Sequence, residues 1–347
     1  MEIRQPDIYK VMNAVYLIKD LRFMTTLMTF AERCISMAKK FNYSKSNLIK
    51  RIYRARQLYF LLALPLIYII VFQYVPMAGL QIAFKEYSIS GGIWGSPWVG
   101  LKYFEKFFSD YNFKRILINT LRLSFYHLFV GSIVTVAFAL ALNCLQNQRL
   151  KKVVQTITYM PHFISIVVLV GMINQFFNTI IGAYGNVWYL LTGERAVDIL
   201  GMPTAFPHLY VWSSIWQNMG YSSIVYIAAL ANVDQELHEA AQIDGASRLQ
   251  RVFYVDIPAI LPTVIIMLIL RTGKIMGVGF EKAYLMQNSL NLSYSEVIST
   301  YVYKKAFGTA GNFSYSTAIG MFNSVVNFLL ITTVNRISKK LNETSLW

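Results

Sequence analysis

The feature that most constrains this chain is a series of apolar stretches, each long enough to cross a lipid bilayer. A transmembrane helix needs about 20 mostly apolar residues, because it must cover the hydrocarbon core and pair its own backbone groups. The sequence therefore predicts an all-α, polytopic membrane protein with about six transmembrane helices, the first closed by Pro76. The six stretches lie at residues 58–75, 116–144, 153–177, 205–233, 257–277 and 313–337.

The composition agrees with a membrane protein. Hydrophobic residues make up 55% of the 347 residues and charged residues only 14%, with a mean hydropathy of +0.43. This is too little polar surface to cover a water-soluble globule. The stretch 180–191 is interrupted by Gly182 and Gly185, which predicts a re-entrant or interfacial piece. Two cysteines, Cys34 and Cys144, are too few and too far apart for a disulfide framework or a metal site.

The distribution of Lys and Arg predicts which loops face the cytoplasm. Basic clusters precede the first span, follow the second at 149–152 and follow the last at 336–340. All three fall on one side when six spans are counted, so both termini and the segment 234–256 are expected to be cytoplasmic. The net charge of +15 then reflects cytoplasmic loops and anionic lipid, and no nucleic-acid partner is expected.

These patterns divide the chain into a basic N-terminal segment at 1–56, a transmembrane domain at 57–340 and a cytoplasmic tail at 341–347. The N-terminal segment holds twelve Lys and Arg against four Asp and Glu. Charges interrupt it too often for a span or a signal peptide, so it is expected to be retained. We expect residues 8–30 to form an amphipathic helix in the membrane plane, bound to anionic lipid or to a specific partner.

The cytoplasmic loop at 232–258 differs from the other loops because its sequence predicts two short helices. Asp234 can cap the first helix, which would stop at Gly245, since glycine readily adopts the left-handed conformation that ends a helix. The second helix would begin at Ala246 and end as Pro258 opens the next span. Two helices joined by a glycine turn on the cytoplasmic face predict a docking element for another protein.

The same loop carries a family motif. The run EAAQIDG at 239–245, followed after nine further residues by VDIP at 255–258, resembles the EAA loop of ABC importer permeases. Val255 and Ile257 depart from the family pattern but keep its apolar character. The resemblance implies a coupling helix that sits in a cleft of a separate ATPase subunit and transmits its closure to the spans. The implied coupling residues are Glu239, Ala240, Ala241, Asp244, Gly245, Ala246 and Arg248.

Two longer runs narrow the resemblance. EAAQIDGAS at 239–247 and EVISTYVYKKAF at 296–307 are similar to carbohydrate-uptake permeases of the oligosaccharide and polysaccharide-fragment type, such as maltose and alginate importers. The resemblance covers about residues 57–340 and implies a type I ABC importer permease in a bacterial inner membrane, working by alternating access. The implied partners are a second homologous permease in a heterodimer, two cytoplasmic ATPase subunits, an extracytoplasmic solute-binding protein and the sugar itself.

Polar residues within the spans are candidates for the substrate pathway, because they are costly in lipid and can hydrogen-bond sugar hydroxyls. Packing between helices is the more common reason for such residues within spans. Tyr284, in the predicted external loop, could stack on a sugar, contact the binding protein or lie in an interfacial aromatic belt. The other candidates are Asn174, Gln175, Gln217, Asn218, Asn323 and Asn327.

No phosphate-binding loop of the form G-x-x-x-x-G-K-[ST] occurs, so ATP and Mg are expected on partner subunits and no cofactor or metal on this chain. Two other classes remain open. An ion-coupled secondary transporter should show acids within its spans and an internal repeat, neither of which is found. A membrane-embedded glycosyl or phosphoryl transferase would need converging acids, for which the candidates are Asp234, Glu236, Glu239 and Asp244 with His238.

Overall fold

The structure is a computed structural model of the chain and describes residues 55–308 and 311–342. The predicted basic segment at 1–56 and the tail at 341–347 therefore lie almost entirely outside the described residues. The chain divides into two compact units, Met1–Gln81 and Ile82–Trp347. Within the described residues the fold is helical, and one isolated antiparallel bridge, Lys85 with Trp98, is the extent of its β structure.

The first described helix runs past the proline that was expected to end it. Helix α4 (Arg56–Ile69) continues as a π-helical turn, η2 (Ile70–Tyr74), and then as a 3₁₀ helix, η3 (Val75–Phe84). The prediction that Pro76 closes the span is therefore wrong. A proline removes one backbone bond and clashes with the preceding α-helical turn, and the change from π to 3₁₀ geometry shifts the carbonyl register at that point.

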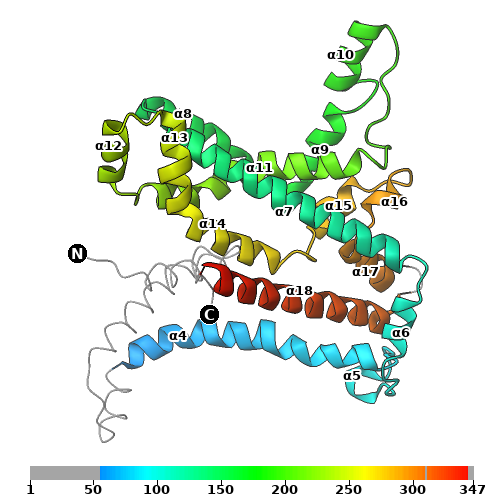
Figure 1. Cartoon of the computed structure of the whole chain (residues 1–347). Coiled ribbons are helices and arrows are strands. Elements are labelled where there is room, and N and C mark those ends of the chain that lie inside the picture. Colours follow the sequence, from blue (N-terminus) through cyan, green and yellow to red (C-terminus); the bar gives the residue numbers. More distant parts are fainter. Residues whose placement is uncertain (1–54, 309–310, 343–347) are drawn as a thin grey trace, which may run out of the picture. The chain divides into compact units, whose positions relative to one another are not determined.

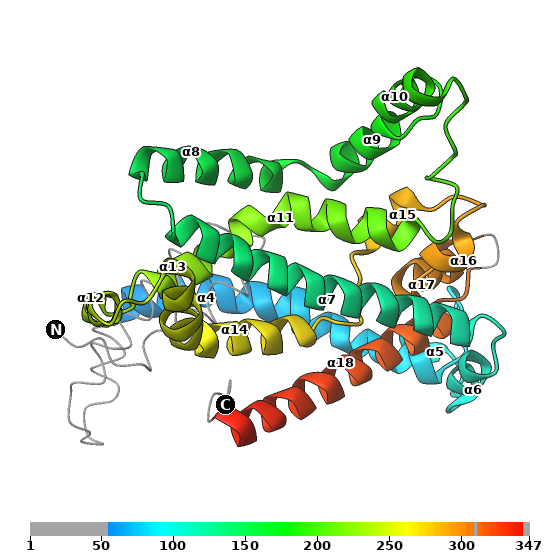
Figure 2. The same cartoon turned by 45° about the horizontal axis from the view of Figure 1, so that its top comes forward.

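The second unit contains two long helices, α7 and α11, that pack along each other, with the remaining helices arranged around them (Figures 1 and 2). Its elements are α5 (Gly92–Gly95), α6 (Lys102–Phe108), α7 (Phe113–Asn143), α8 (Gln148–Tyr159), η4 (Met160–Phe163), α9 (Ile166–Phe176), α10 (Ala183–Thr192), α11 (Phe206–Leu230), α12 (Gln235–Ile243), α13 (Arg248–Arg251), η5 (Val252–Asp256), α14 (Ile257–Thr272), α15 (Phe280–Met286), α16 (Leu292–Ser295), α17 (Ile298–Phe307) and α18 (Phe313–Asn342).

Among the described residues, four helices are long and apolar enough to cross a membrane, and they match four of the predicted spans. Helix α11 coincides with the predicted stretch 205–233 and has 25 residues, or about 37 Å at 1.5 Å per residue. Its most apolar stretch is less hydrophobic than those of the four helices, because serine, asparagine and glutamine side chains interrupt it. The four helices are Arg56–Phe84, Phe113–Asn143, Arg248–Thr272 and Phe313–Lys340.

The predicted span at 153–177 is not one straight helix. Two helical pieces, Gln148–Phe163 and Ile166–Phe176, meet at an angle of 100° (Figure 2), and together they would raise the number of candidate spans to five. Ile164 has an extended backbone at the bend. The Ser165 side chain then caps the start of α9 by accepting a hydrogen bond from the Val168 amide, so the chain restarts a helix in a new direction.

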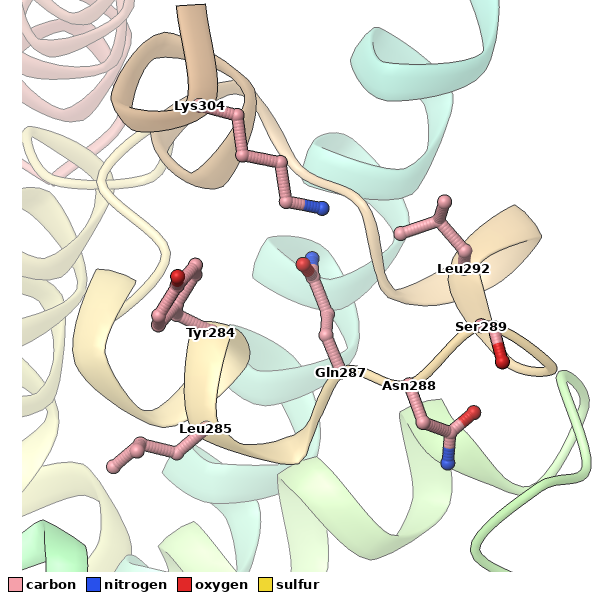
Figure 3. Close-up of a pocket in the computed structure, with 7 residues that line it drawn as sticks. All are labelled: Tyr284, Leu285, Gln287, Asn288, Ser289, Leu292 and Lys304. Carbon is pink, nitrogen blue, oxygen red and sulfur yellow. The ribbon is translucent and has the colours of Figure 1, made fainter. Parts of the chain in front are cut away.

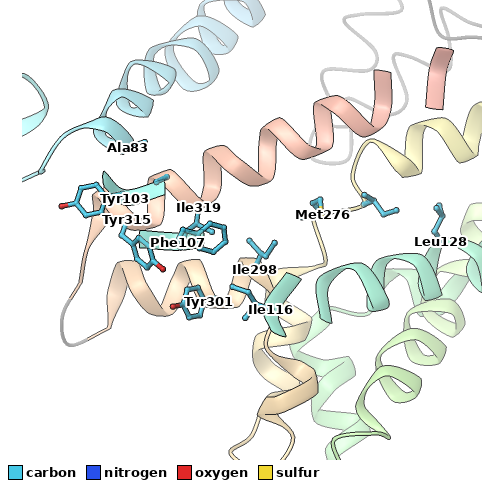
Figure 4. Close-up of a cluster of buried hydrophobic side chains, with 12 residues drawn as sticks. Ala83, Tyr103, Phe107, Ile116, Leu128, Met276, Ile298, Tyr301, Tyr315 and Ile319 are labelled. Carbon is cyan, nitrogen blue, oxygen red and sulfur yellow. The ribbon is translucent and has the colours of Figure 1, made fainter. Parts of the chain in front are cut away.

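Two clusters of buried side chains hold the second unit together. The first joins α6, α7, α17 and α18, where Phe107, Ile116, Ile298 and Ile319 are fully buried (Figure 4). The second joins α7, α9, α11 and α15 through residues such as Leu123, Leu169, Val211 and Ala283. These clusters fix α15 and α17 against the long helices.

Candidate functional site

The loop between α11 and α14 forms the first predicted helix as expected. Asp234 caps α12 by accepting a hydrogen bond from the Glu236 amide, at 3.0 Å. The helix ends at Gly245, whose φ of +78° lies in the left-handed region that favours glycine. The Ala246 amide then donates to the Ala241 carbonyl at 2.9 Å, which satisfies the last turn.

The second predicted helix differs at both ends. It begins at Arg248, because Ser247 and Gln250 form a capping box in which each side chain accepts from the other's backbone amide. It does not stop before Pro258 but continues through η5 into α14, so that Arg248–Thr272 is one helix of 25 residues. Pro258 lies in the first turn of α14, where a missing amide is tolerated.

The predicted coupling residues lie on an open surface. Glu239, Ala240, Asp244, Gly245 and Arg248 are exposed, and Ala241 and Ala246 are partly covered. Apolar side chains of the same hairpin also face outward, with Ile243 86% and Leu249 71% exposed. Both views place α12 at the opposite end of the second unit from α15, α16 and α17 (Figures 1 and 2). This hairpin therefore offers charged, small and apolar groups to a partner at one end of the unit.

A contact that the sequence analysis missed joins this hairpin to the long helix behind it. His238 Nε2 on α12 lies 3.3 Å from Asp256 Oδ1, at the end of η5. Arg251 donates to the Gln242 side-chain oxygen at 3.5 Å on the same hairpin. Neither pair had a signal in the sequence, because 18 and nine residues separate the partners and only the folded hairpin brings them together.

Three predicted pathway residues make hydrogen bonds that hold helices together. Gln217 Nε2 donates to the Ile164 carbonyl at 2.8 Å, and Asn218 Oδ1 lies 3.0 Å from His162 Nδ1. Asn327 Oδ1 accepts from the Met276 amide at 3.0 Å. These bonds agree with the packing alternative, and a role in the pathway stays a prediction for each residue.

The other predicted span residues differ from these three. Asn174 and Gln175 are exposed near the end of α9. Asn323 is half-buried on α18, and its Oδ1 is buried with no hydrogen-bond partner among the described residues. A role in the pathway stays a prediction for these residues too.

Tyr284 lies in a pocket of about 500 Å³ between α15, α16 and α17 (Figure 3). Lys304 and Gln287 line the same pocket, and the span candidates do not. Gln287 Nε2 donates to the Ser295 carbonyl at 2.8 Å, whereas its Oε1 is buried with no hydrogen-bond partner among the described residues. The pocket therefore combines an aromatic face, a cation and a buried acceptor without a donor.

A buried carboxylate lies behind this pocket. Glu296 is 5% exposed and pairs with Arg115 at 2.5 Å and with Lys304 at 3.4 Å. Two cations thus face one anion, and of these three groups Lys304 is the one that lines the pocket. Gln287 and Lys304 were not singled out from the sequence, since an isolated polar residue in a loop carries no pattern.

The acids of the transferase alternative do not converge. Asp234 is used as a helix cap, and Glu236, Glu239 and Asp244 are exposed along one short helix. Within residues 55–308 and 311–342, no three His, Cys, Asp or Glu side chains lie close enough to hold a metal ion. The arrangement favours docking over acid–base chemistry.

Comparisons with known proteins agree with this geometry. Residues 131–343 match the family of binding-protein-dependent transport system inner membrane components. The chain is 42% identical to Protein LplB of Bacillus subtilis, over 85% of this chain and 92% of that protein. It is 37% identical to the polygalacturonan/rhamnogalacturonan transport system permease protein YteP of the same species, over 87% of this chain and 94% of that protein.

A solved structure shares the fold. The chain resembles a subunit of a bacterial ABC transporter that imports the acidic polysaccharide alginate, with 36% identity and a TM-score of 0.79. The match covers 86% of this chain and all of that one. The same likeness, at 35% identity, extends to the alginate transporter in complex with its periplasmic protein carrying an alginate pentasaccharide.

The chain belongs to the family of inner-membrane components of binding-protein-dependent transport systems, and it is the permease subunit of an ABC importer. Such permeases transport the substrate, and ATP hydrolysis takes place on separate subunits. The fold class and the transport function predicted from the EAA loop are thereby confirmed, and the transferase and ion-coupled alternatives lose their support.

Proposed function

We propose that this permease forms one half of a pathway for oligosaccharides with acidic sugar residues, in the inner membrane of a bacterium. The other half is a second, homologous permease subunit, and a solute-binding protein delivers the sugar from outside. The observation that carries this proposal is the match over nearly the whole chain to relatives that transport alginate and polygalacturonan. The chain's own pocket and docking hairpin supply independent support.

The docking hairpin supports a pair of ATPase subunits as cytoplasmic partners. Its exposed Ala240 and Gly245 are small enough to let the backbone of the hairpin approach a cleft closely. Exposed Glu239 offers a charged contact, and exposed Ile243 adds apolar area. In this proposal ATP and Mg bind only to those subunits. Closure of the ATPase subunits brings the two hairpins of the dimer together and opens the cavity outward. Both termini of this chain then lie in the cytoplasm with α12.

The outward pocket supports an acidic sugar as the substrate. Its volume of about 500 Å³ falls in the usual range for small-molecule sites, about 300–1,000 Å³. The Tyr284 ring offers a flat surface for a sugar ring. Lys304, which shares Glu296 with Arg115, can turn to a sugar carboxylate.

Uptake by the complete importer in proteoliposomes tests this proposal, with an oligouronate and a neutral oligosaccharide of equal length as substrates. We expect the oligouronate to be taken up and Lys304→Gln to raise its KM about tenfold, since one charge-assisted contact is worth roughly 1.4 kcal/mol. Lys305→Gln is the matched control, because Lys305 is exposed on α17 and does not line the pocket. Preference for the neutral sugar, or equal effects of both variants, would contradict the acidic substrate.

A further inference from the structure

Helix α12 is attached to the rest of the permease by very few side chains. None of its nine residues is buried, and only His238 and Ala241 are partly covered. A helix of this length gains little stability from its own backbone bonds. Whatever force a partner applies to α12 must therefore pass through the hairpin backbone, through these covered side chains or through Gln242, which accepts a hydrogen bond from Arg251.

His238 makes the one ionic contact that leaves α12 among the described residues. Its Nε2 lies 3.3 Å from Asp256 Oδ1, with the two side chains 22% and 5% exposed. Besides His238, Arg251 is a second basic residue whose charge acts on the Asp256 carboxylate. Because a buried carboxylate without a partner is costly, the protein favours arrangements in which His238 stays against Asp256.

Asp256 is placed where a displacement reaches the membrane span directly. It is the last residue of η5, and the next residue begins α14. The helix Arg248–Thr272 is continuous through this point, so a displacement of Asp256 passes along the same helical backbone into α14. The same helix begins at Arg248, where Ser247 and Gln250 form its capping box.

We propose that the His238–Asp256 pair is the link that transmits movement of the docking helix α12 to the span α14. This inference rests on the proposed docking of ATPase subunits at α12. His238 and Asp256 are positioning residues, since they touch neither nucleotide nor sugar. The Arg251–Gln242 hydrogen bond, at 3.5 Å, braces the same hairpin across its turn.

The readout that separates a mechanical link from a merely stabilising contact is the number of sugars transported per ATP hydrolysed. A contact that only stabilised the fold would change the melting temperature and the yield of the complex, and the ratio would stay constant. A link would change the ratio while the ATPase subunits remain bound. The assay uses the complete importer in proteoliposomes with its binding protein.

We expect His238→Ala and Asp256→Asn each to lower the ratio about fivefold, the factor that corresponds to about 1 kcal/mol of coupling between contacting side chains. Asp256→Asn keeps the size of the side chain, so it guards against misfolding. The double variant should be no worse than either single variant. The exchange His238→Asp with Asp256→His should recover about half of the lost coupling. Glu236→Gln, an exposed charge on the same helix, is the matched control.

Two results would overturn the link. If the wild-type importer couples and the His238 and Asp256 variants match Glu236→Gln, α12 moves α14 by another route. Additive losses in the double variant would equally exclude a shared contact. If the wild-type permease retains no ATPase subunits on purification, the proposed docking itself fails, and this inference falls with it.

Discussion

The two ends of the second unit are built in opposite ways. At the end that carries α15, α16 and α17, Lys282, Asn291 and Glu296 are at most 5% exposed, and their polar groups are hydrogen-bonded or paired. At the other end, every residue of α12 is at least partly exposed. The end with α15, α16 and α17 is thus a rigid frame around a pocket, whereas α12 has few side-chain contacts with the rest of the described chain.

Lys282 illustrates the rigid end. Its ammonium group donates to the Tyr210 carbonyl and to the hydroxyls of Ser213 and Ser214, at 2.7–3.0 Å, which ties α15 to α11. Burial lowers the pKa of this lysine to about 7. Buried polar contacts stabilise this end of the unit, whereas α12 has few contacts and is the element that we propose to transmit movement. Each of the following changes tests one side of this comparison.

The largest effect is expected from Asn291→Ala. The Asn291 side chain donates to the Leu200 and Met286 carbonyls, both at 3.0 Å, and accepts from Ser295 at 2.8 Å. Its loss leaves several buried groups unpaired and should lower the free energy of unfolding by about 3 kcal/mol. Thermal unfolding of the permease in detergent measures this change in the free energy of unfolding. Asn232→Ala, an exposed asparagine beside the docking hairpin, should cost less than about 0.5 kcal/mol, and equal costs would contradict the contrast.

Asp110→Asn should have the next largest effect. Asp110 precedes α7 and accepts from the Tyr301 and Tyr315 hydroxyls at 2.5 and 2.8 Å. Burial acts to raise the pKa of Asp110, but these bonds and those from Asn112 outweigh it and hold the pKa below its usual value. At neutral pH the substitution should cost about 2 kcal/mol, since both bonds go to a charged acceptor.

The sign of the pH dependence follows from the lowered pKa. The unfolded chain binds a proton on Asp110 at a higher pH than the folded protein does, so the carboxylate's stabilisation is complete above the unfolded pKa of about 3.9. It is lost as the pH falls through the folded value. The difference in melting temperature between wild type and Asp110→Asn should therefore shrink below pH 4. A constant difference from pH 7 to pH 3 would contradict this assignment.

Gly245→Ala should act on the docking hairpin with a smaller cost. The φ of +78° at Gly245 is unfavourable for alanine, by about 1 kcal/mol. Because no side chain of α12 is buried, we expect little change in melting temperature. We expect sugar uptake to fall several-fold, since the substitution strains the turn of the docking hairpin. Gly171→Ala, at an open position within α9, is the control and should leave uptake unchanged.

Ile243→Ser should have the smallest effect on stability. Ile243 is 86% exposed, so its removal should change the free energy of unfolding by less than about 0.5 kcal/mol. If the hairpin docks on an ATPase subunit, the same change should weaken retention of that subunit during purification. A clear loss of stability, with retention unchanged, would place Ile243 in the permease core.

Features set by neighbouring residues could be predicted from the sequence, and those set by distant contacts could not. The cap at Asp234 and the stop at Gly245 depend on local backbone chemistry, and both were predicted. The predicted start of the second helix at Ala246 was wrong. Ser247 and Gln250 have capping-box spacing, which could have marked Ser247 as the N-cap.

The remaining differences have longer-range causes. Whether Pro76 ends a helix depends on the π turn before it, which composition does not reveal. The 100° bend before α9 was hidden because both pieces are apolar. His238 and Asp256, and likewise Gln217 and the Ile164 carbonyl, meet only in the folded chain. A polar residue in a span therefore gave no sign of whether it binds a helix or a sugar.

The most direct test of this account is hydrogen–deuterium exchange of the permease, alone and with its ATPase subunits and a nonhydrolysable ATP analogue. The account predicts that amides of α12 exchange rapidly in the free permease and slow at least about tenfold on assembly. Amides of α15, α16 and α17 should exchange slowly in both states. If α12 is equally protected with and without the ATPase subunits, the hairpin is not the docking element and the central claim is wrong.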